Sequence, residues 1–312
     1  MSADVPSPDD QIFELEADVV LTSRARIARN LSGSPFVHRS DPEQCQTVAE
    51  EIRTAAECVV KVHQELTSFL KTGLTLPEID AFVGKTLKSL NCKSAFFKYS
   101  IPGQSPFPSQ SCLSVNECIV HGTHVMEQTP LKPGDLVSID IGSKYKGWIG
   151  DAAWTWAIEY ASDENMRLME AGRKSLSSGI EAMQPGRPLI DFARAVQQVA
   201  ERDYPFHLVR GLGGHGYGKT LHCPPYISNA VPSHPAEWPD ALKLFEEGML
   251  LAVEPMLTVG TPEIKQSRGA WPIYSADNSM SVHYEADILI TKEGHINFTK
   301  ELETLPYVIG TP

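Results

Sequence analysis

The sequence lacks a run of about eighteen apolar residues, the length that a helix needs to cross a membrane. Its first twenty residues are acidic and contain neither a basic stretch nor an apolar core, so we expect no secretory signal peptide. Positive charge is also scarce, because 27 lysines and arginines stand against 39 aspartates and glutamates, a formal net charge of −12. A nucleic-acid-binding protein needs a basic face, so the composition disfavours this class.

Cysteine pairs with the spacing of a metal site are lacking too. The six cysteines are scattered along the chain: Cys45, Cys58, Cys92, Cys112, Cys118 and Cys223. This pattern does not indicate a structural zinc site. In a chain of 312 residues without an export signal, we expect free thiols in a reducing compartment, which makes the cytoplasm the expected location. A hydrophobic content of 42% is ordinary for a globular enzyme with a sizeable core.

The first clear pattern in the sequence is that of two successive amphipathic helices. Apolar positions at helical spacing predict a long helix that begins after Asp41, as its N-cap, and ends before Gly73. Thr75 and Glu78 form a capping-box pattern, which predicts the start of a second helix.

A similar pair of helices is predicted within residues 164–203. The dipeptide Ile79-Asp80 of the first pair and Ile190-Asp191 of the second occupy matching places. Strand-like runs and glycine-rich loops follow each pair. We therefore expect two related halves, roughly residues 45–160 and 161–305, that close on one site. Chance similarity between two helical hairpins would give the same pattern.

The stretch LVSIDIGSKYKGWIGDAAW, residues 136–154, predicts a β-hairpin with an aspartate inside each strand. Aspartate is disfavoured in strands. With the turn at residues 144–147, a symmetric ladder places Asp140 directly opposite Asp151 on one face. Two charges about 5 Å apart repel by roughly 3 kcal/mol at an effective dielectric of about 20. Either one carboxyl group stays protonated or a cation lies between them, unless a shifted register turns one aspartate to solvent.

Three further residues favour the cation. His215 lies among glycines in GLGGHGYGKTLHCPPYI, residues 211–227, where backbone and side chain can approach a ligand closely. Glu254 and Glu285 interrupt apolar, strand-like runs, and a buried carboxylate must be paired or bind a metal. A single such residue usually belongs to an ion pair. Four carboxylates and one imidazole instead suit a pair of divalent Mn, Fe, Co or Zn ions.

These candidates and their order make the sequence resemble the type I methionine aminopeptidases over about residues 45–305. The motifs of the resemblance are VHG at 120–122, Asp140 and Asp151 with ten residues between them, GHGYGKTLH at 214–222, EPM at 254–256 and YE at 284–285. The resemblance implies an α+β pita-bread fold, in which two pseudo-symmetric halves form a curved antiparallel sheet covered by helices.

The resemblance also implies roles for the site residues. Two divalent ions would be held by Asp140, Asp151, His215, Glu254 and Glu285. A water between the ions would attack the scissile carbonyl, with Glu254 as the acid/base. His222 would hydrogen-bond the substrate carbonyl, and His121 would lie near the scissile amide or the amino end of the substrate. His124 is an alternative to His121.

A methionine pocket is implied as well. Its lining residues would be Phe107, Cys112, His121, Leu221 and Trp271. Ordinary core packing is the alternative for Leu221 and Cys112. The sequence departs from the family pattern at Cys223, where glutamate is usual, and at Ala286, where histidine is frequent. Neither departure removes a metal ligand.

The implied function is removal of the N-terminal methionine from proteins and peptides with a small second residue. Nascent N-termini would be the partners, with no direct contact to nucleic acid or membrane, and the protein would be a monomer. One rival is an Xaa-Pro peptidase of the same fold, which the sequence EPM rather than EPG disfavours. The other is a non-catalytic peptide-binding protein, which the complete set of five ligands disfavours.

We predict an N-terminal extension, residues 1–44, before the metallopeptidase domain, residues 45–312. In the extension, VVLTSRARIARNLSGSPFVHR at residues 19–39 resembles the start of the ATP:guanido phosphotransferases, where arginines meet nucleotide phosphates. An anion could be bound by Arg24, Arg26 and Arg29. Because no kinase domain follows, we expect a docking arm that packs on the peptidase domain instead.

Overall fold

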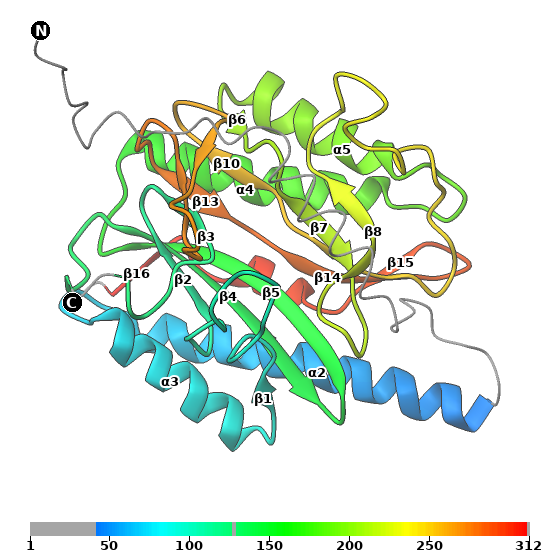
Figure 1. Ribbon diagram of the computed structural model, residues 1–312, viewed down its shortest axis with the longest axis horizontal. Helices are drawn as coiled ribbons and strands as arrows, with labels where there is room; N and C mark the ends of the chain where they lie inside the picture. The colour runs from blue at the N-terminus through cyan, green and yellow to red at the C-terminus, as the bar shows by residue number, and fades with distance from the viewer. Residues whose placement is uncertain (1–41, 127–128, 311–312) are drawn as a thin grey trace, which may run out of the picture.

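The computed structural model describes residues 42–126 and 129–310 (Figure 1). The arginine-containing segment 19–39 and the proposed N-cap Asp41 lie outside the described residues. No helix in the described ranges is both long enough and apolar enough to span a bilayer.

The first predicted helix pair is confirmed as α2 (Pro42–Phe69) and α3 (Leu76–Ser89). The capping box forms as expected, because the Thr75 backbone N–H donates to Glu78 Oε2 at 2.8 Å. Helix α2 lies along the central hairpin of the first half, and its buried His63 places Nε2 3.1 Å from the Ile139 carbonyl oxygen. Amphipathic spacing therefore directs the apolar face of α2 onto the sheet.

The central hairpin consists of β4 (Leu136–Tyr145) and β5 (Trp148–Ile158). Its turn is Lys146-Gly147, where both residues have positive φ, as in the two-residue turns that match strand twist. Asp140 therefore pairs with Ala153 and not with Asp151, so the prediction of directly opposed aspartates is wrong. The pairing moves by two residues along one strand, and side chains alternate with period two, so both aspartates remain on one face as diagonal neighbours.

The second half repeats the order of helices before strands. Its helices are α4 (Asp163–Ala182) and α5 (Ile190–Gln197), and α5 continues as the π-helical segment η2 (Gln198–Asp203). Figure 1 shows α2 and α3 on one side of the strands and α4 and α5 on the other. This arrangement agrees with two helix pairs that cover one curved layer of strands.

The strands form two larger and two smaller sheets. The sheet of the first half has the order β1-β4-β5-β16, with β2 paired to β4; its other members are β1 (Lys93–Ser94), β2 (Cys112–Val115) and β16 (Val308–Ile309). The sheet of the second half has the order β15-β14-β9-β7-β8: β7 (Gly213–Gly216), β8 (Cys223–Ser228), β9 (Leu250–Val253), β14 (Ala286–Ile290) and β15 (His295–Asn297).

The two smaller sheets have three strands each. One has the order β13-β10-β6: β6 (His207–Leu208), β10 (Met256–Thr258) and β13 (Ser281–His283). The other has the order β11-β12-β3: β3 (Cys118–Val120), β11 (Ile264–Lys265) and β12 (Ile273–Ser275). A 3-10 helix, η3 (Lys300–Thr304), precedes the last strand.

The two halves meet where β5 lies beside β14, in the middle of Figure 1. The Glu285 backbone N–H donates to the Ala153 carbonyl at 2.9 Å, and the Asp151 N–H donates to Asp287 Oδ2 at 2.8 Å. One hydrophobic core extends across this seam, from Val59 of α2 to the second half. The seam therefore brings acidic residues of both halves together inside a rigid layer of strands.

The prediction that every cysteine is a free thiol is wrong for Cys58 and Cys92. The structure joins them in a disulfide between α2 and the segment after α3, at a sequence separation of 34. Packing of the two helices brings these positions together, and their sequence spacing gives no sign of it. Among the cysteines whose side chains the structure describes, Cys112, Cys118 and Cys223 are free thiols, and all three are buried. The cytoplasmic location, which drew on free thiols, stays a prediction.

Candidate active site

The five predicted metal ligands all lie at the seam. Their positions are Asp140 in β4, Asp151 in β5, His215 in β7, Glu254 directly after β9 and Glu285 directly before β14. Glu254 is slightly more accessible, and the other four are buried. Each strand is anchored on an apolar core face, so the fold holds these polar groups in a dry environment that it would otherwise avoid.

Two overlapping groups of ligand atoms, each within 4.8 Å of one another, occur among the described residues. One group is Asp151, His215 and Glu285, and the other is Glu254, His283 and Glu285. The His215 Nε2 atom lies 3.9 Å from Asp151 Oδ2 and 3.8 Å from Glu254 Oε1. Four of the five predicted ligands therefore converge, with a histidine that the sequence interpretation did not include.

Asp140 lies outside both groups but touches them. Cys112 lies directly opposite it in β2, and interactions with Cys112 and Asp151 both contribute to its pKa. The pKa of Asp140 is raised to about 7, the net result of burial, an electrostatic interaction with His283 that lowers the pKa and one with Glu254 that raises it. Asp140 thus belongs to the same electrostatic cluster.

The remaining carboxyl groups of the site also have raised pKa values. Burial raises the pKa of Glu254 to about 7. Burial and then neighbouring carboxylates raise the pKa values of Asp151 and Glu285 well above the ordinary range. Protein side chains alone therefore do not balance the negative charge of this cluster.

The hydrogen-bonding state of the cluster fits a divalent cation. Within residues 42–126 and 129–310, the buried oxygens Asp140 Oδ1 and Asp151 Oδ1 have no hydrogen-bond partner. Buried carboxylate oxygens are normally paired, and an unpaired one destabilises the fold. Divalent ions of the Mn, Fe, Co and Zn series accept such an oxygen-rich set completed by imidazole.

His283 is the site residue that the sequence interpretation missed. Its side chain is 2% exposed, and its Nε2 atom lies 3.3 Å from Glu254 Oε2. A usable signal was present, because His283 and Glu285 are two residues apart in an extended segment and so share a face. Burial lowers the pKa of His283 to about 4, which keeps the imidazole neutral at physiological pH.

The structure separates His121 from its alternative, His124. The His121 ring lies edge-on to Trp271, with centroids 6.3 Å apart, and burial, followed by the charges of two cluster histidines, lowers its pKa to about 4. The His124 ring instead turns toward Asp80, with 3.5 Å between Nδ1 and Oδ2. His121 is therefore the histidine of this pair that joins the cluster.

His222 stands beside His215, with ring centroids 4.4 Å apart. Its Nδ1 atom lies 2.7 Å from the hydroxyl of Tyr99, a second residue that the sequence interpretation missed. Burial raises the pKa of Tyr99 to about 12, so the phenol stays protonated. When this phenol donates to Nδ1, the imidazole proton lies on Nε2.

The predicted pocket residues come together in one hydrophobic cluster. Its members include Phe107, Cys112, Leu221 and Trp271. The Trp271 ring meets Phe107 edge-on at 5.2 Å, and its Nε1 donates to the Ser105 carbonyl at 2.9 Å. Leu221 and Cys112 are both 5% exposed. The cluster adjoins the acidic site through Cys112, whose pKa is raised well above its ordinary value by burial and then by Asp140.

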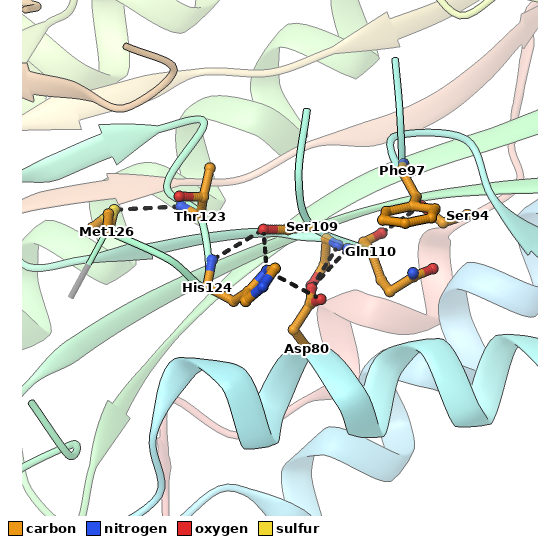
Figure 2. Close-up of polar contacts among 9 residues, drawn as sticks. Asp80, Ser94, Phe97, Ser109, Gln110, Thr123, His124 and Met126 are labelled. Carbon is orange, nitrogen blue, oxygen red and sulfur yellow. Dashed lines mark hydrogen bonds and ion pairs between the residues drawn. The ribbon is translucent and has the colours of Figure 1, made fainter. Parts of the chain in front are cut away.

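The loop that carries Phe107 and Cys112 is anchored by Asp80 of α3 (Figure 2). Asp80 Oδ1 accepts hydrogen bonds from the backbone N–H groups of Gln110 at 2.8 Å and Ser111 at 3.1 Å. The buried Ser109 hydroxyl and Asp80 both face Nδ1 of His124, so this ring cannot pass a proton between them as in a hydrolase triad. The network holds the loop in place and does not form a second active site.

Comparisons with known proteins agree with this geometry. The pattern of metallopeptidase family M24 matches residues 50–292. The Aquifex aeolicus methionine aminopeptidase is 32% identical over 256 residues, which cover 82% of this chain and 97% of the relative. The Rickettsia prowazekii methionine aminopeptidase structure has a TM-score of 0.74 at 28% identity and covers 81% of this chain and 97% of its own. The Thermotoga maritima X-Pro aminopeptidase, at 18% identity and a TM-score of 0.62, shows likeness of fold alone.

Proposed function

The chain belongs to metallopeptidase family M24, and we infer that it is a methionine aminopeptidase of α+β pita-bread fold that removes the N-terminal methionine from proteins and peptides. Its relatives of that name are matched over nearly their full length. The observation that carries the chemistry is the convergence of the Asp151 and Glu285 carboxylates on His215 at the seam, together with the unpaired buried oxygens of Asp140 and Asp151. The predicted substrates are the N-termini of nascent chains with a small second residue.

The metal centre is proposed to hold two divalent ions of Co, Mn, Fe or Zn. The proposed ligands are Asp140, Asp151, His215, Glu254 and Glu285. When bound, such ions polarise a carbonyl group and lower the pKa of a water molecule toward neutrality. The chain has already placed the carboxylates that this chemistry needs in a low-dielectric layer, where electrostatic interactions are strong.

Glu254 is proposed as the acid/base. One carboxylate oxygen faces His215 at 3.8 Å and the other faces His283 at 3.3 Å, so the group lies between two imidazoles. Glu254 would take a proton from the attacking water and deliver it to the leaving amine.

His222 is proposed to stabilise the negative charge that develops on the substrate carbonyl oxygen. Because the Tyr99 hydroxyl occupies Nδ1, the Nε2–H group is left to donate to that oxygen. Tyr99 is thus a positioning residue that sets the tautomer and orientation of the ring. His121, beside Trp271, is proposed to lie near the scissile amide at the mouth of the methionine pocket.

The pocket is proposed to select methionine. Phe107, Cys112 and Leu221, with Trp271 and His121 at the edge, form an apolar wall suited to a polarisable thioether. A charged first residue would lose its hydration there without compensation. Replacement of Leu221 by Ala should relax the choice of first residue. The pocket should discriminate against a first side chain that differs by one methylene by only about 1–3 kcal/mol.

A peptide panel tests the function. Met-Ala-Ser should be cleaved in the presence of Mn or Co, whereas Lys-Ala-Ser should not. Preference for proline in the second position, whatever the first residue, would make the protein an Xaa-Pro peptidase. Binding of the panel without cleavage under every metal condition would favour a peptide-binding protein.

The N-terminal extension is proposed to be dispensable for the chemistry, since every proposed site residue lies at or beyond Tyr99. Deletion of residues 1–40 should leave kcat and KM for a short peptide within a few-fold, and the protein should remain monomeric. Measurable ATP affinity by calorimetry would contradict the docking-arm prediction and support a phosphate site at the three arginines.

A further inference from the structure

The two groups of ligand atoms at the seam have a common composition. Each contains one histidine and two carboxylates, and Glu285 belongs to both. His215 serves the first group and His283 serves the second. The five proposed ligands, by contrast, include one histidine only. A second imidazole in the ligand shell is therefore a property of this structure beyond the proposed five-residue centre.

His283 is rigidly placed for such a role. It ends β13, where it pairs with Met256 of β10. Its backbone exchanges two hydrogen bonds with the Thr155 hydroxyl, which donates to the His283 carbonyl at 2.8 Å and accepts from its N–H at 3.0 Å. This anchor in β5 fixes the histidine against the strand that carries Asp151.

The imidazole itself is buried and directed at the cluster. Its Nε2 atom has no hydrogen-bond partner in the part of the chain that the structure describes, although Glu254 Oε2 lies 3.3 Å away. A buried ring nitrogen without a partner destabilises a fold. The unpaired Nε2 therefore resembles the unpaired Oδ1 atoms of Asp140 and Asp151, which suit a cation site.

We propose that His283 is an additional metal ligand, so that each of two ion positions has one imidazole and the carboxylate of Glu285 is shared between them. The proposal rests on the proposed function only in that the site binds two divalent ions. An added nitrogen donor shifts the preference of the second position from oxygen-seeking ions such as Mn toward Co, Zn or Fe.

The test counts bound imidazoles with cobalt as the probe. A histidine bound to Co²⁺ through Nε2 keeps its Nδ1 proton, which gives a strongly shifted, solvent-exchangeable proton NMR signal. His215 meets this condition, because its Nδ1 faces the Gly216 carbonyl at 3.1 Å. The intact protein with two equivalents of Co²⁺ should show two such signals, and H283Q and H215Q should each lose one of them.

The matched control is H222Q, which removes a ring of the same cluster that belongs to neither ligand group. This variant should keep both signals. Calorimetric titration should show weaker binding of one of the two Co²⁺ ions to H283Q, by about 10- to 100-fold. Circular dichroism of each metal-free variant verifies that it is folded. If H283Q does not fold, the number of shifted signals in the unaltered protein still tests the proposal.

One shifted signal in the unaltered protein, or two in H283Q, would overturn the proposal. If the unaltered protein binds two Co²⁺ ions and cleaves Met-Ala-Ser but shows one signal, His283 acts only on Glu254 and the proposed function stands. Failure to bind Co²⁺ at all would overturn both.

Discussion

Asp80 and Asp151 are both buried aspartates, 7% and 3% exposed, yet their surroundings differ completely. Asp80 Oδ1 accepts hydrogen bonds from two backbone N–H groups and from the Ser111 hydroxyl, and Oδ2 faces His124 (Figure 2). Asp151 Oδ1 has no partner among the described residues, and its near neighbours include three other carboxylates. One aspartate is satisfied by the protein, and the other is not.

The comparison separates a structural carboxylate from a proposed metal ligand. Burial alone does not distinguish them, because desolvation raises the pKa of both carboxyl groups. What distinguishes them is whether hydrogen-bond donors in the fold compensate for that burial. Each prediction below tests this distinction.

Removal of the metal should have the largest effect. Treatment with a chelator should reduce methionine release to the background rate, and added Co or Mn should restore it, because the water and the carbonyl would both lose their activation. Asp151→Asn should lower metal content measured by atomic emission, whereas Asp80→Asn should not. Full activity of the metal-stripped protein would contradict the mechanism.

His222→Ala should lower kcat by about 100- to 1,000-fold, the usual effect of losing one oxyanion donor. KM and metal content should change little, since the ring belongs to neither ligand group. Steady-state kinetics and metal analysis on the same sample check this. A metal content that falls along with kcat would place His222 among the ligands.

Asp80→Ala should destabilise the fold by about 2–5 kcal/mol, because it leaves two buried N–H groups without an acceptor. Asp151→Ala should destabilise the metal-free protein less, because it removes charge repulsion. Denaturant unfolding in the presence of chelator measures both. Equal losses would show that the two aspartates are not different in kind.

The stability of the metal-free protein should depend on pH through Asp140. Its pKa is about 7 in the folded state, against an ordinary value of 3.8, so the folded protein holds a proton that the unfolded chain releases. The free energy of unfolding therefore falls as pH rises through this window. Asp140→Asn should remove that contribution, so its stability gain over the unaltered protein should be greater at pH 8 than at pH 5. A gain that is independent of pH would contradict the raised pKa.

Tyr99→Phe should have the smallest effect, a few-fold decrease in kcat that corresponds to one hydrogen bond of about 1 kcal/mol. Because the ring of His222 would lose the partner that selects its tautomer, the decrease should appear in kcat and not in KM. Tyr145→Phe, on a tyrosine at the tip of the hairpin, is the matched control and should leave both constants unchanged.

The sequence by itself determined the helices, the hairpin and four of the residues that converge at the candidate metal site. Periodicity and capping chemistry are local, so α3 begins after Thr75 as predicted. The alternation of a strand also kept Asp140 and Asp151 on one face, although the turn residues moved their pairing by two positions. Carboxylates in several strand-like runs, together with one histidine among glycines, were sufficient to predict a metal centre.

Tertiary structure alone decided which residues complete the site. Tyr99 meets His222 across 123 residues, and Cys58 meets Cys92, because packing of distant elements brings them together. His283 carried a local signal, its spacing from Glu285, but only the seam between the two halves shows that its Nε2 has no partner other than the acidic cluster in the described chain. Hydrogen-bond satisfaction depends on every neighbour in space, and a sequence pattern gives only the neighbours along the chain.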